Sequence, residues 1–485
     1  MREDILKAKL EKLANLRNAN VDPYPEKSQR THFNKEVLDN FDSIKGEVFL
    51  VGRVKSVRPM GGSSFVHIED ESGKMQLFLN KNNIGADEYK LFTKNIELGD
   101  FIQVNGDLFK TKTEEKTLAV KSWKILTKNI RPIPTEYYGL KDVEKLLRKR
   151  YLDLMGNEET RELFRKKSLF WQTVRKVLTD NGFLEVQTPV LESVPGGADA
   201  EPFITHYNAL NQDFYLRISL ELHLKRLLVG GYEKVFEIGR VFRNEGISRE
   251  HLQEFDHIEF YWAYADMENG MELTEKLYKA IAKEMLGEKM ISNWEDNEIN
   301  WGESWPRVDY FTEFKKETEI DLSADVTVAE LRKKADELGI KYDKTDGKGR
   351  MIDTIYKKTV RQKLIQPCFL VGHPIEVSPL AKKDPTTPNR VLRFQPIACK
   401  SELGNGFSEL NDPIDQRERF EEQMKLREAG DSEAQMLDED FIEALEYGMP
   451  PAFGFGMSER LFAVMMGRSV RETVIFPSVR TIEEK

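Results

Sequence analysis

The chain has 485 residues, of which 40% are hydrophobic and 32% are charged, and its formal net charge is −10 at pH 7. This composition is typical of a soluble globular protein of about three domains, and the negative charge argues against non-specific coating of nucleic acid. Two cysteines, Cys368 and Cys399, are too few for a zinc site or a disulfide framework. The N-terminus lacks the apolar segment of a signal peptide and no apolar run is long enough for a membrane span, so we expect a cytoplasmic protein.

The first quarter of the chain predicts a helix followed by a small β-barrel. Residues 1–45 are expected to form a helix with a lead-in, because Leu6, Leu10 and Leu13 share one helical face. Five short β-type runs follow within residues 46–128, separated by Gly, Asn, Asp and Lys clusters. Five short strands in fewer than a hundred residues favour a small closed barrel, of which the OB-fold is one.

One face of this barrel carries side chains that suit nucleic acid. OB-folds bind single strands by stacking bases on aromatic rings and by reading base edges with polar groups. Phe65 and His67 share a strand face, because residues two apart point the same way, and Gln76 and Phe78 do likewise on the next strand. A place for Phe65 in the barrel core is the alternative, and the sequence alone leaves both open.

Residues 129–150 contain two prolines near their start and are interpreted as a linker, after which a mixed α/β domain occupies residues 151–485. Residues 305–366 are polar with helical spacing and are expected to form a mostly helical insertion. Two basic clusters, 141–150 and 165–167, suit either contact with phosphate or an ordinary solvated surface.

The most informative stretch of the chain is 235–266. Two alternating apolar runs, Val235–Phe242 and His257–Ala265, predict paired strands, and the turn between them is far longer than a tight hairpin needs. Long ordered loops are usually functional. Arg243 and Glu245 follow the first strand, and a cation beside a carboxylate suits a triphosphate and an adenine base. A solvated hairpin whose charges have no role is the alternative.

The sequences FRNEG, HLQEF and IEFYWAYAD within this stretch resemble motif 2 of the class II aminoacyl-tRNA synthetases, and of the lysyl enzymes in particular. Asn181–Pro189, NGFLEVQTP, resembles motif 1, which implies a homodimer. Gly454–Arg460, GFGMSER, resembles motif 3, although it is one residue shorter than the family pattern and has Glu459 where the family has Asp. The resemblance extends over nearly the whole chain and includes the signature GNGFSELND, which the aspartyl and asparaginyl enzymes lack.

The resemblance implies an α+β protein with an N-terminal five-stranded OB-fold β-barrel that binds the anticodon. A class II catalytic domain with an antiparallel sheet flanked by helices would follow. It also implies a lysine–tRNA ligase of bacterial type that uses ATP with Mg²⁺ to activate L-lysine, charges tRNA(Lys) and has no membrane partner. One rival is a degenerate synthetase that serves as an RNA-binding or interaction protein. A second rival is a protein lysyltransferase, although such relatives lack the anticodon domain that this chain keeps.

The same resemblance implies the roles of individual residues. The catalytic cations would be Arg243 on the α-phosphate and Arg460 on the γ-phosphate. The ATP site would comprise Arg243, Glu245, His251, Phe255, Glu402 and Arg460. The lysine pocket would comprise Gly197, Glu221, Glu259, Tyr261, Asn405, Phe407 and Glu409, in which carboxylates pair with the substrate ammonium. The anticodon would be read by Arg58, Phe65, Gln76 and Glu115. Glu402 matches a magnesium ligand whose usual glutamate partner, seven residues earlier, is replaced by Gln395 in this chain.

Overall fold

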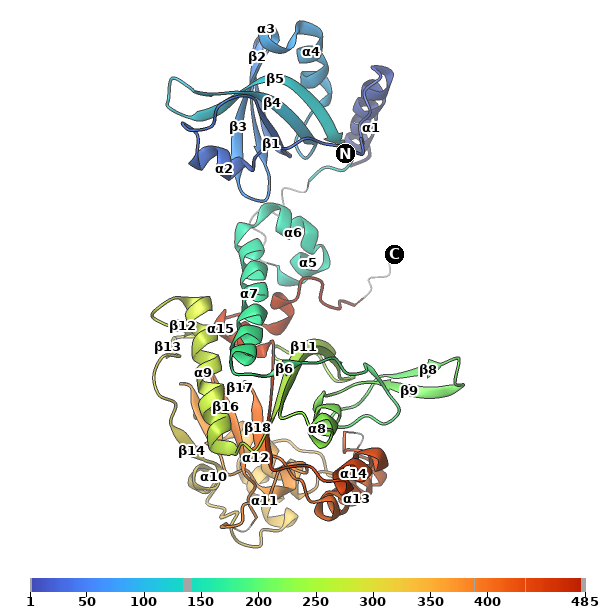
Figure 1. The fold of residues 1–485 in the computed structure, drawn as a ribbon, viewed down its shortest axis with the longest axis vertical. Coiled ribbons are helices and arrows are strands. Elements are labelled where there is room, and N and C mark those ends of the chain that lie inside the picture. The colour runs from blue at the N-terminus through green and yellow to red at the C-terminus, as the bar shows by residue number, and fades with distance from the viewer. Residues whose placement is uncertain (1, 134–141, 388, 432, 481–485) are drawn as a thin grey trace. The chain divides into compact units, whose positions relative to one another are not determined.

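A computed structural model describes residues 2–133, 142–387, 389–431 and 433–480 of the chain (Figure 1). The chain divides into two compact units, Met1–Lys141 and Asp142–Lys485. Part of the predicted linker, residues 134–141, lies outside the described residues. Among the helices that the structure does describe, none has both the length and the apolar character that crossing a bilayer requires.

The N-terminal unit is a closed five-stranded barrel with the strand order β1-β2-β3-β5-β4. Its strands are β1 (Val48–Met60), β2 (Ser63–Glu69), β3 (Lys74–Asn80), β4 (Phe101–Lys110) and β5 (Lys116–Thr127). Its helices are α1 (Arg2–Asn18), α2 (Asn34–Asp39), α3 (Lys81–Ile84) and α4 (Ala86–Asn95). Strand β2 alternates between the barrel core, which Val66 and Ile68 enter, and the outside, because successive side chains of a strand point to opposite faces. The five-stranded OB-fold barrel expected from the sequence is confirmed.

Helix α1 is attached to this barrel through a buried charge network. Lys9 and Lys12 of α1 donate to the two oxygens of Glu97, at 2.8 and 2.6 Å. Lys128, whose side chain is fully buried, donates to the same carboxylate at 3.1 Å and to Asp100 at 2.8 Å. Burial would raise the pKa of Glu97, but the three ammonium groups together lower it to about 2. The residues expected as a separate lead-in therefore pack onto the barrel as one unit.

In the described part of the second unit, nine strands form one sheet in the order β14-β15-β16-β18-β19-β11-β10-β6, with β17 paired to β16. The strands are β6 (Leu184–Glu185), β10 (Lys234–Phe242), β11 (Glu254–Ala263), β14 (Arg307–Asp309), β15 (Cys368–Val371), β16 (Arg393–Ala398), β17 (Ser401–Glu402), β18 (Asn405–Ser408) and β19 (Ala452–Ser458). All neighbouring strands are antiparallel except β14 with β15 and β10 with β6. The sheet is therefore mixed, with parallel pairs only at its two edges.

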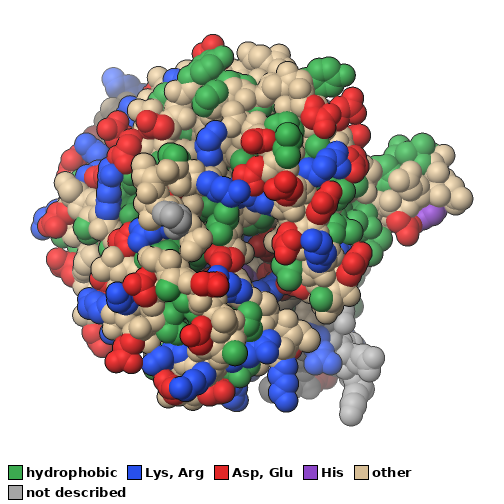
Figure 2. All heavy atoms as spheres, turned by 90° about the horizontal axis from the view of Figure 1, so that it is seen from below, with side chains coloured by type: hydrophobic (Ala, Val, Ile, Leu, Met, Phe, Trp, Pro, Cys, Tyr) green, Lys and Arg blue, Asp and Glu red, His purple; other side chains and the backbone are tan. Residues whose placement is uncertain are grey.

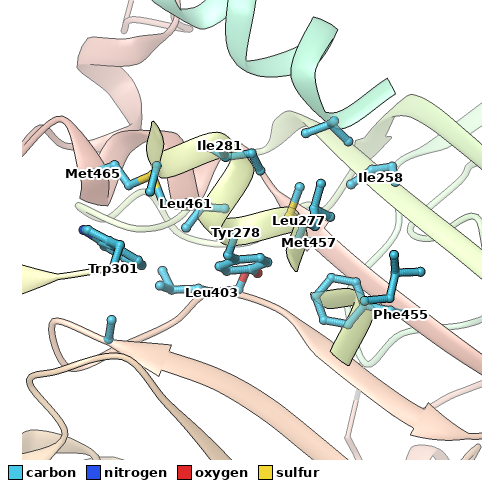
Figure 3. Packing of buried hydrophobic residues seen from close by; sticks show 14 of the residues in the cluster. Ile258, Leu277, Tyr278, Ile281, Trp301, Leu403, Phe455, Met457, Leu461 and Met465 are labelled. Atoms are coloured by element: carbon cyan, nitrogen blue, oxygen red, sulfur yellow. The ribbon is translucent and has the colours of Figure 1, made fainter. Parts of the chain in front are cut away.

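Two long helices, α7 (Glu158–Asp180) and α9 (Met267–Leu286), cover one face of this sheet and enclose the main hydrophobic core. Side chains of α9 lie over β19 in this core, among them Leu277, Tyr278 and Ile281 (Figure 3). The hydroxyl of Tyr278 donates to the carbonyl oxygen of Leu403 at 2.8 Å, which satisfies the only polar atom of its side chain. The C-terminal helices α15 (Arg460–Met465) and η4 (Val470–Thr473) complete this side of the unit.

Strand alternation places the polar side chains on the other face. On β11, Ile258 and Phe260 enter the core beneath α7 and α9, whereas Glu259 and Tyr261 point away from it. On β19, Phe455 and its neighbours two residues away enter the same core, while the glycines between them face the opposite side. A buried, polar sheet face is unusual in a stable domain, and it marks where a ligand would bind.

The expected insertion is helical but begins inside the sheet, because Arg307–Asp309 forms strand β14. Its helices are α10 (Tyr310–Thr318), α11 (Val328–Glu337), α12 (Lys348–Lys358) and η2 (Arg361–Lys363). They share a core with Leu370 and Ile397 of the sheet. The C-terminal part of the expected linker is also helical, since α5 (Val143–Arg148) and α6 (Arg150–Gly156) belong to the second unit. Asp142 caps α5 by accepting from the main-chain nitrogen of Lys145.

The remaining elements surround the polar face or lie at the edges of the second unit. The helices are α8 (Glu221–Val229), η3 (Ile375–Val377), α13 (Pro413–Glu428) and α14 (Glu439–Glu446). A small sheet consists of β7 (Leu191–Glu192), β8 (Ile204–Tyr207) and β9 (Gln212–Leu216). A separate hairpin consists of β12 (Ile291–Trp294) and β13 (Asn297–Asn300). Figure 1 shows the β8–β9 hairpin projecting from the second unit.

Candidate functional site

The polar face of the large sheet forms the wall of a cavity of about 1000 Å³. The surface of the second unit seen in Figure 2 is hollowed near its centre, with positive and negative side chains around the hollow. Thirteen of the residues singled out from the sequence line the cavity: Gly197, Glu221, Arg243, Glu245, His251, Phe255, Glu259, Tyr261, Gln395, Glu402, Asn405, Phe407 and Arg460. Glu409 does not line it and lies fully buried behind the wall.

Arg243 and Arg460, together called the basic group, bring two cations to the cavity without carboxylate partners. Arg243 donates to a main-chain carbonyl at 3.3 Å, and its guanidinium carbon lies 5.4 Å from the centre of the Phe255 ring. Arg460, the first residue of α15, donates to the carbonyl oxygens of Glu250 and Glu402 at 3.2 and 3.0 Å. Among the described residues, no carboxylate oxygen forms an ion pair with either side chain. Two unpaired guanidinium groups in one cavity are suited to an anionic ligand.

Two further side chains lie beside the basic group. Burial raises the pKa of Glu245, and the neighbouring Arg243 opposes that rise. The Nδ1 atom of His251 lies 2.8 Å from the hydroxyl oxygen of Ser248. Partial burial of the His251 ring, together with Arg460, lowers its pKa to about 4, so the ring is neutral at pH 7. A neutral imidazole can donate one hydrogen bond and accept another.

The short motif that ends in Arg460 still delivers this side chain to the cavity. Glu459, where the family has Asp, is buried against Lys167, with which it forms an ion pair. Burial raises the pKa of Glu459, and Lys167 opposes that rise. Lys167 also donates to the carbonyl oxygen of Thr473 at 2.9 Å. Lys167 of the 165–167 cluster is therefore engaged inside the protein, where it fixes the strand-to-helix turn.

Glu259, at the centre of the polar face, is held by hydrogen bonds from three sides. It accepts from the hydroxyl of Ser219 at 2.6 Å, from the main-chain nitrogen of Leu220 at 2.9 Å and from the hydroxyl of Tyr261 at 2.8 Å. Burial would raise the pKa of Glu259, but the nearby His257, the Ser219 hydroxyl and the main-chain nitrogen of Leu220 together lower it. Glu259 therefore stays ionised although it is only 4% exposed, and it offers a fixed negative charge to a cationic ligand.

A second pair of carboxylates shares one internal lysine. The fully buried ammonium of Lys225 lies 2.5 Å from Glu221 Oε1 and also forms an ion pair with Glu409 Oε2. Burial raises the pKa of Glu221 to about 7 and that of Glu409 well above its usual value, and Lys225 opposes both rises. The sequence-based site lacks Lys225, although its spacing of four residues from Glu221 on a helix is the signal for this pair. Glu221, Glu259 and Glu409 are together called the acidic group.

Two glycines are required by the close packing around the acidic group. Gly197 has a φ of +83°, and a Cβ added there would lie 2.9 Å from both Glu221 Cβ and Ser219 Oγ. Gly454 on β19 lies against Glu409 so closely that an added Cβ would overlap its Oε1 atom. A side chain at either position would therefore displace a member of the acidic group.

Two more cavity residues from the sequence-based set occupy β18. The carbonyl oxygen of the Asn405 side chain accepts from Arg393 Nε at 2.7 Å, which fixes the amide. Phe407 is 8% exposed, and its ring centre lies 5.5 Å from the ammonium nitrogen of Lys225. Phe407 therefore forms an apolar wall next to the charged residues.

The residues expected to hold magnesium are not equivalent. Glu402 lines the cavity, and its side chain is half-exposed. Gln395 is buried, and its Oε1 atom lies 3.1 Å from the Nε2 atom of His373. Burial lowers the pKa of His373 to about 3, so this contact joins two neutral groups. Within the described ranges, no group of three or more His, Cys, Asp or Glu side chains is arranged to hold a metal ion.

The insertion contributes cavity residues that the sequence did not indicate. Lys357 of α12 lines the cavity and pairs with Asp353 at 2.6 Å. Arg361 also lines it, and its buried Nε atom has no hydrogen-bond partner among the described residues. Burial raises the pKa of Tyr356, Glu402 adds to this rise and Arg361 opposes it, so both charges lie near this ring. Arg361, like Arg393, is therefore a further cavity cation that forms no ion pair with a carboxylate among the described residues.

The N-terminal barrel presents a row of aromatic rings outside its core. The ring centres of Phe65 and Phe78 are 5.1 Å apart, and those of Phe78 and Phe109 are 5.9 Å apart. All three side chains are half-exposed, and none belongs to the barrel core. Arg58 is exposed and lies opposite Phe65 in the strand register. Phe65 is thus a surface ring and not a core residue.

The polar residues expected beside this row have partners within the barrel. Gln76 is buried and donates to the hydroxyl of Thr117 at 2.9 Å. Glu115 is exposed, and its carboxylate lies 3.6 Å from His67 Nε2. The other ring nitrogen of His67 lies 3.0 Å from the hydroxyl oxygen of Ser56. His67 is therefore the barrel residue beside Glu115, a proximity that the sequence did not reveal.

Both units resemble known sequence families. Residues 142–480 match the family described as tRNA synthetases class II (D, K and N), and residues 48–126 match the family described as OB-fold nucleic acid binding domain. The two matched ranges fall in the two units into which the chain divides. The nucleic-acid family thus coincides with the unit that carries the aromatic row.

Curated relatives match over almost the whole chain. A lysine–tRNA ligase from Pelotomaculum thermopropionicum is 44% identical over 485 residues, which cover 99% of this chain and 96% of that protein. A lysine–tRNA ligase from Bacillus subtilis (strain 168) is 44% identical over 487 residues, with coverages of 98% and 97%. A third, from Halalkalibacterium halodurans, is 45% identical with the same coverages of 98% and 97%.

Proposed function

Because the chain belongs to the class II tRNA synthetases of the D, K and N group, we propose that it activates L-lysine with ATP and joins it to the 3′ end of tRNA(Lys). The observation that carries this proposal is the acidic group beside the cavity that also holds the basic group. A lysine ammonium in a buried pocket needs carboxylate partners, whereas an aspartate or asparagine side chain needs cationic or amide donors. The acidic group therefore favours lysine among the three amino acids of this family.

The ATP-binding residues of the proposal are those on and beside the basic group. Arg243 would contact the α-phosphate and Arg460 the γ-phosphate, and in the part of the chain that the structure describes neither forms an ion pair with a carboxylate. Phe255 would lie under the adenine ring, Glu245 would accept from the adenine amine, and the neutral His251 would lie near the outer phosphates. Support comes from the place of the half-buried Phe255 ring on the cavity wall beside Glu245, since a planar base can stack on an aromatic face.

Mg²⁺ would bind together with ATP. The bound ion would neutralise part of the negative charge on the phosphates. Mg²⁺ keeps several waters and is usually bound by one or two carboxylates together with the phosphates of the substrate. The carboxylate of Glu402 fits this requirement. Gln395 fits less well, because its amide oxygen lies beside His373 and carries no charge. We therefore propose Glu402 as the principal protein ligand and Gln395 as at most a neutral one.

The lysine pocket of the proposal combines ionic and apolar contacts. Glu259 would hold the α-amino group, and the acidic side chains Glu221 and Glu409 with the Tyr261 hydroxyl would balance the ε-ammonium. Asn405 and the main chain at Gly197 would orient the amino acid, and Phe407 would cover its aliphatic stem. Support comes from the fixed ionisation of Glu259, since a group with a lowered pKa remains a partner for a cation throughout the neutral range.

The reaction proceeds in two steps on this arrangement. The lysine carboxylate attacks the α-phosphorus of ATP in line, the α–β phosphoanhydride bond breaks, and pyrophosphate leaves. Arg243 and Arg460 stabilise the charge that develops on the phosphate oxygens. A terminal ribose hydroxyl of the tRNA then attacks the lysyl carbonyl carbon, and AMP leaves. The chain supplies no nucleophile, so positioning and electrostatic stabilisation provide the acceleration.

The barrel would read the lysine anticodon, which is rich in uridine. Phe65 would stack on one base, and Gln76 and Glu115 would hydrogen-bond base edges, with Arg58 near the backbone. The exposed aromatic row supports this role, because stacking needs a ring that the barrel core does not occupy. A protein that acts on cytosolic tRNA and ATP is expected in the cytoplasm.

We also propose that the protein is a homodimer. Several large apolar side chains around β6 to β9 are exposed: Leu184, Val190, Leu191, Ile204, Tyr207 and Leu210. Exposed apolar side chains gathered in one region favour an interface between subunits. Sedimentation equilibrium of the wild type and of an Ile204→Glu variant tests this, since the charge would convert a dimer to monomers. A monomeric wild type would contradict the homodimer alone.

The central experiment is ATP–pyrophosphate exchange with the purified chain. Exchange should depend on L-lysine and should be absent with aspartate or asparagine. Gln395 and the shortened motif 3 suggested a degenerate synthetase as a rival function. A chain that binds tRNA but shows no lysine-dependent exchange would favour that rival. Transfer of lysine to a protein acceptor but not to tRNA would favour the protein lysyltransferase.

A further inference from the structure

Lys225 is a cation that the chain itself supplies inside the proposed lysine pocket. Its side chain is fully buried on α8, and its ammonium contacts Glu221 at 2.5 Å and forms an ion pair with Glu409. The rings of Phe407 and Phe441 lie 5.5 and 5.8 Å from the same ammonium nitrogen. Lys225 therefore occupies a closed position between two carboxylates and two aromatic rings, behind the cavity wall.

Burial would lower the pKa of Lys225, but the two carboxylates outweigh this effect and raise it, so the ammonium stays charged. When both carboxylates are ionised, Glu221, Glu409 and Lys225 together carry one negative charge. The side chain of a lysine substrate brings one positive charge. The two charges balance only because one carboxylate is already neutralised from behind.

We propose that Lys225 is a positioning residue that sets the specificity of the amino-acid pocket, because it leaves the Glu221–Glu409 pair with a single negative charge for one ammonium group. The proposal rests on the proposed function, in which this pair balances the ε-ammonium of lysine. The residue that would determine amino-acid specificity is therefore buried and does not line the cavity.

The electrostatics of the pair explain why an internal cation is needed. Two buried carboxylates that lie close together share a proton, because both cannot be ionised without a compensating charge. Burial raises the pKa of each carboxyl group, and Lys225 is the strongest opposing influence on both. The other groups that act on the pair are Glu259 and Tyr261 of β11 and Arg393 of β16. Without Lys225, the pair would keep its proton at neutral pH and would attract an ammonium less strongly.

A purely structural ion pair is the alternative explanation. A buried ion pair often contributes little to stability, because the loss of hydration offsets the attraction between the charges. A structural role for Lys225 would also affect lysine use equally at every pH. Charge balance, in contrast, predicts an effect that changes with pH and depends on Glu409.

The first experiment measures kcat/KM for lysine in ATP–pyrophosphate exchange between roughly pH 6 and pH 9, where the carboxyl pair titrates. In the wild type, kcat/KM for lysine should fall as the pH drops, because the coupled Glu221–Glu409 pair, whose carboxyl pKa values are both raised by burial, takes up a proton and loses the charge that accepts the ammonium. Lys225→Met removes the cation that lowers both carboxyl pKa values, so the fall should begin at a higher pH. The loss at pH 7 should be about tenfold to a hundredfold, as expected for a shift of one to two pKa units, and should shrink as the pH rises.

The second experiment combines Lys225→Met with Glu409→Gln. Glu409→Gln alone leaves Glu221 and Lys225 with no net charge, so it should raise the KM for lysine more than Lys225→Met does. The double variant again carries one negative charge, on Glu221, and should therefore use lysine better than Glu409→Gln alone. A double variant that is worse than both single variants at every pH would overturn the proposal.

Controls separate folding from charge balance. The dissociation constant for ATP should stay within about twofold of the wild type in all three variants, because the basic group is unchanged. If Lys225→Met fails to bind ATP, Lys225→Gln keeps a hydrogen-bond donor without the charge and serves in its place. A wild type without lysine-dependent exchange would contradict the proposed function. An active wild type whose pH profile is unchanged by both Lys225 variants would contradict the role of Lys225 alone.

Discussion

The basic group lines the cavity, the acidic group lies on its wall and behind it, and the two groups hold their charges in different ways. Arg243 and Arg460 donate to main-chain carbonyls and have no carboxylate partner in the described chain. Glu221 and Glu409, in contrast, are already paired with Lys225, a residue of the same chain. The basic group therefore awaits the charge of its ligand, whereas the Glu221–Glu409 pair of the acidic group is balanced in advance to within one charge. Cations without carboxylate partners can thus bind a highly charged ligand. Carboxylates that are already paired with an internal lysine can select a small ligand in the same site.

The largest effect should follow a change in the basic group. Arg243→Ala should lower the rate of lysine-dependent exchange by about 10²- to 10³-fold, because it removes a fixed charge that stabilises the transition state. Binding of tRNA to the separate barrel should stay nearly unchanged, as a filter-binding assay would report. Normal exchange in this variant would remove Arg243 from the reaction.

A smaller effect, specific for lysine, should follow a change next to the acidic group. Gly454→Ala would force Glu409 to move, so the KM for lysine should rise by about tenfold to fiftyfold, as expected for an overpacked buried site. The KM for ATP should change by less than about threefold. Gly246→Ala is the matched control, since an added methyl group there meets nothing within 4 Å. Equal changes in both Michaelis constants would show that the two groups are not independent.

The barrel provides a reference outside both groups. Phe65→Ala should lower kcat/KM for tRNA about tenfold, because stacking on one base contributes on the order of 1–3 kcal/mol. Pyrophosphate exchange should be unaffected. Phe33→Ala, which removes an exposed ring outside the aromatic row, is the control and should leave charging unchanged. A defect of the Phe65 variant in exchange would contradict the division of work between the two units.

The smallest effect should come from the insertion. Arg361→Ala should raise the KM for ATP about threefold to fivefold, because a partly exposed cation contributes roughly 1 kcal/mol. Lys358→Ala removes an exposed cation of α12 that does not line the cavity, and it should have no effect. Identical steady-state constants for the two variants would exclude Arg361 from the phosphate site.

Local patterns in the sequence predicted those parts of the fold that depend on local alternation. The runs Val235–Phe242 and His257–Ala265 form β10 and β11, and β11 begins earlier, at Glu254, because Phe242 and Glu254 pair across the hairpin. The five barrel strands were predicted for the same reason. Helix α5 falls within the range interpreted as a linker. Its six residues include three charged ones and bury only Leu147, so they show no clear helical pattern of apolar residues.

The sequence predicted the residues that face the cavity better than the buried residues behind them. Motifs identify residues that face a ligand, and all the expected cavity residues except Glu409 line the cavity. Lys225 and Arg361 were missed, because their importance depends on charges that are distant in sequence. Glu409 follows β18 directly, 188 positions after Glu221, and only the folded sheet brings both to one ammonium. No local sequence pattern predicts a contact between residues so far apart in the chain.

The position of β19 has a consequence for synthesis of the chain on the ribosome. This strand, Ala452–Ser458, is the last of the large sheet to be made, yet it lies between β11 and β18 at the centre. Until it emerges, the facing edges of β11 and β18 lack their partner, and exposed strand edges promote aggregation. The nascent catalytic unit therefore stays incomplete until the chain has been translated beyond residue 458. Addition of β19 therefore completes the active site and covers the exposed strand edges in the same step.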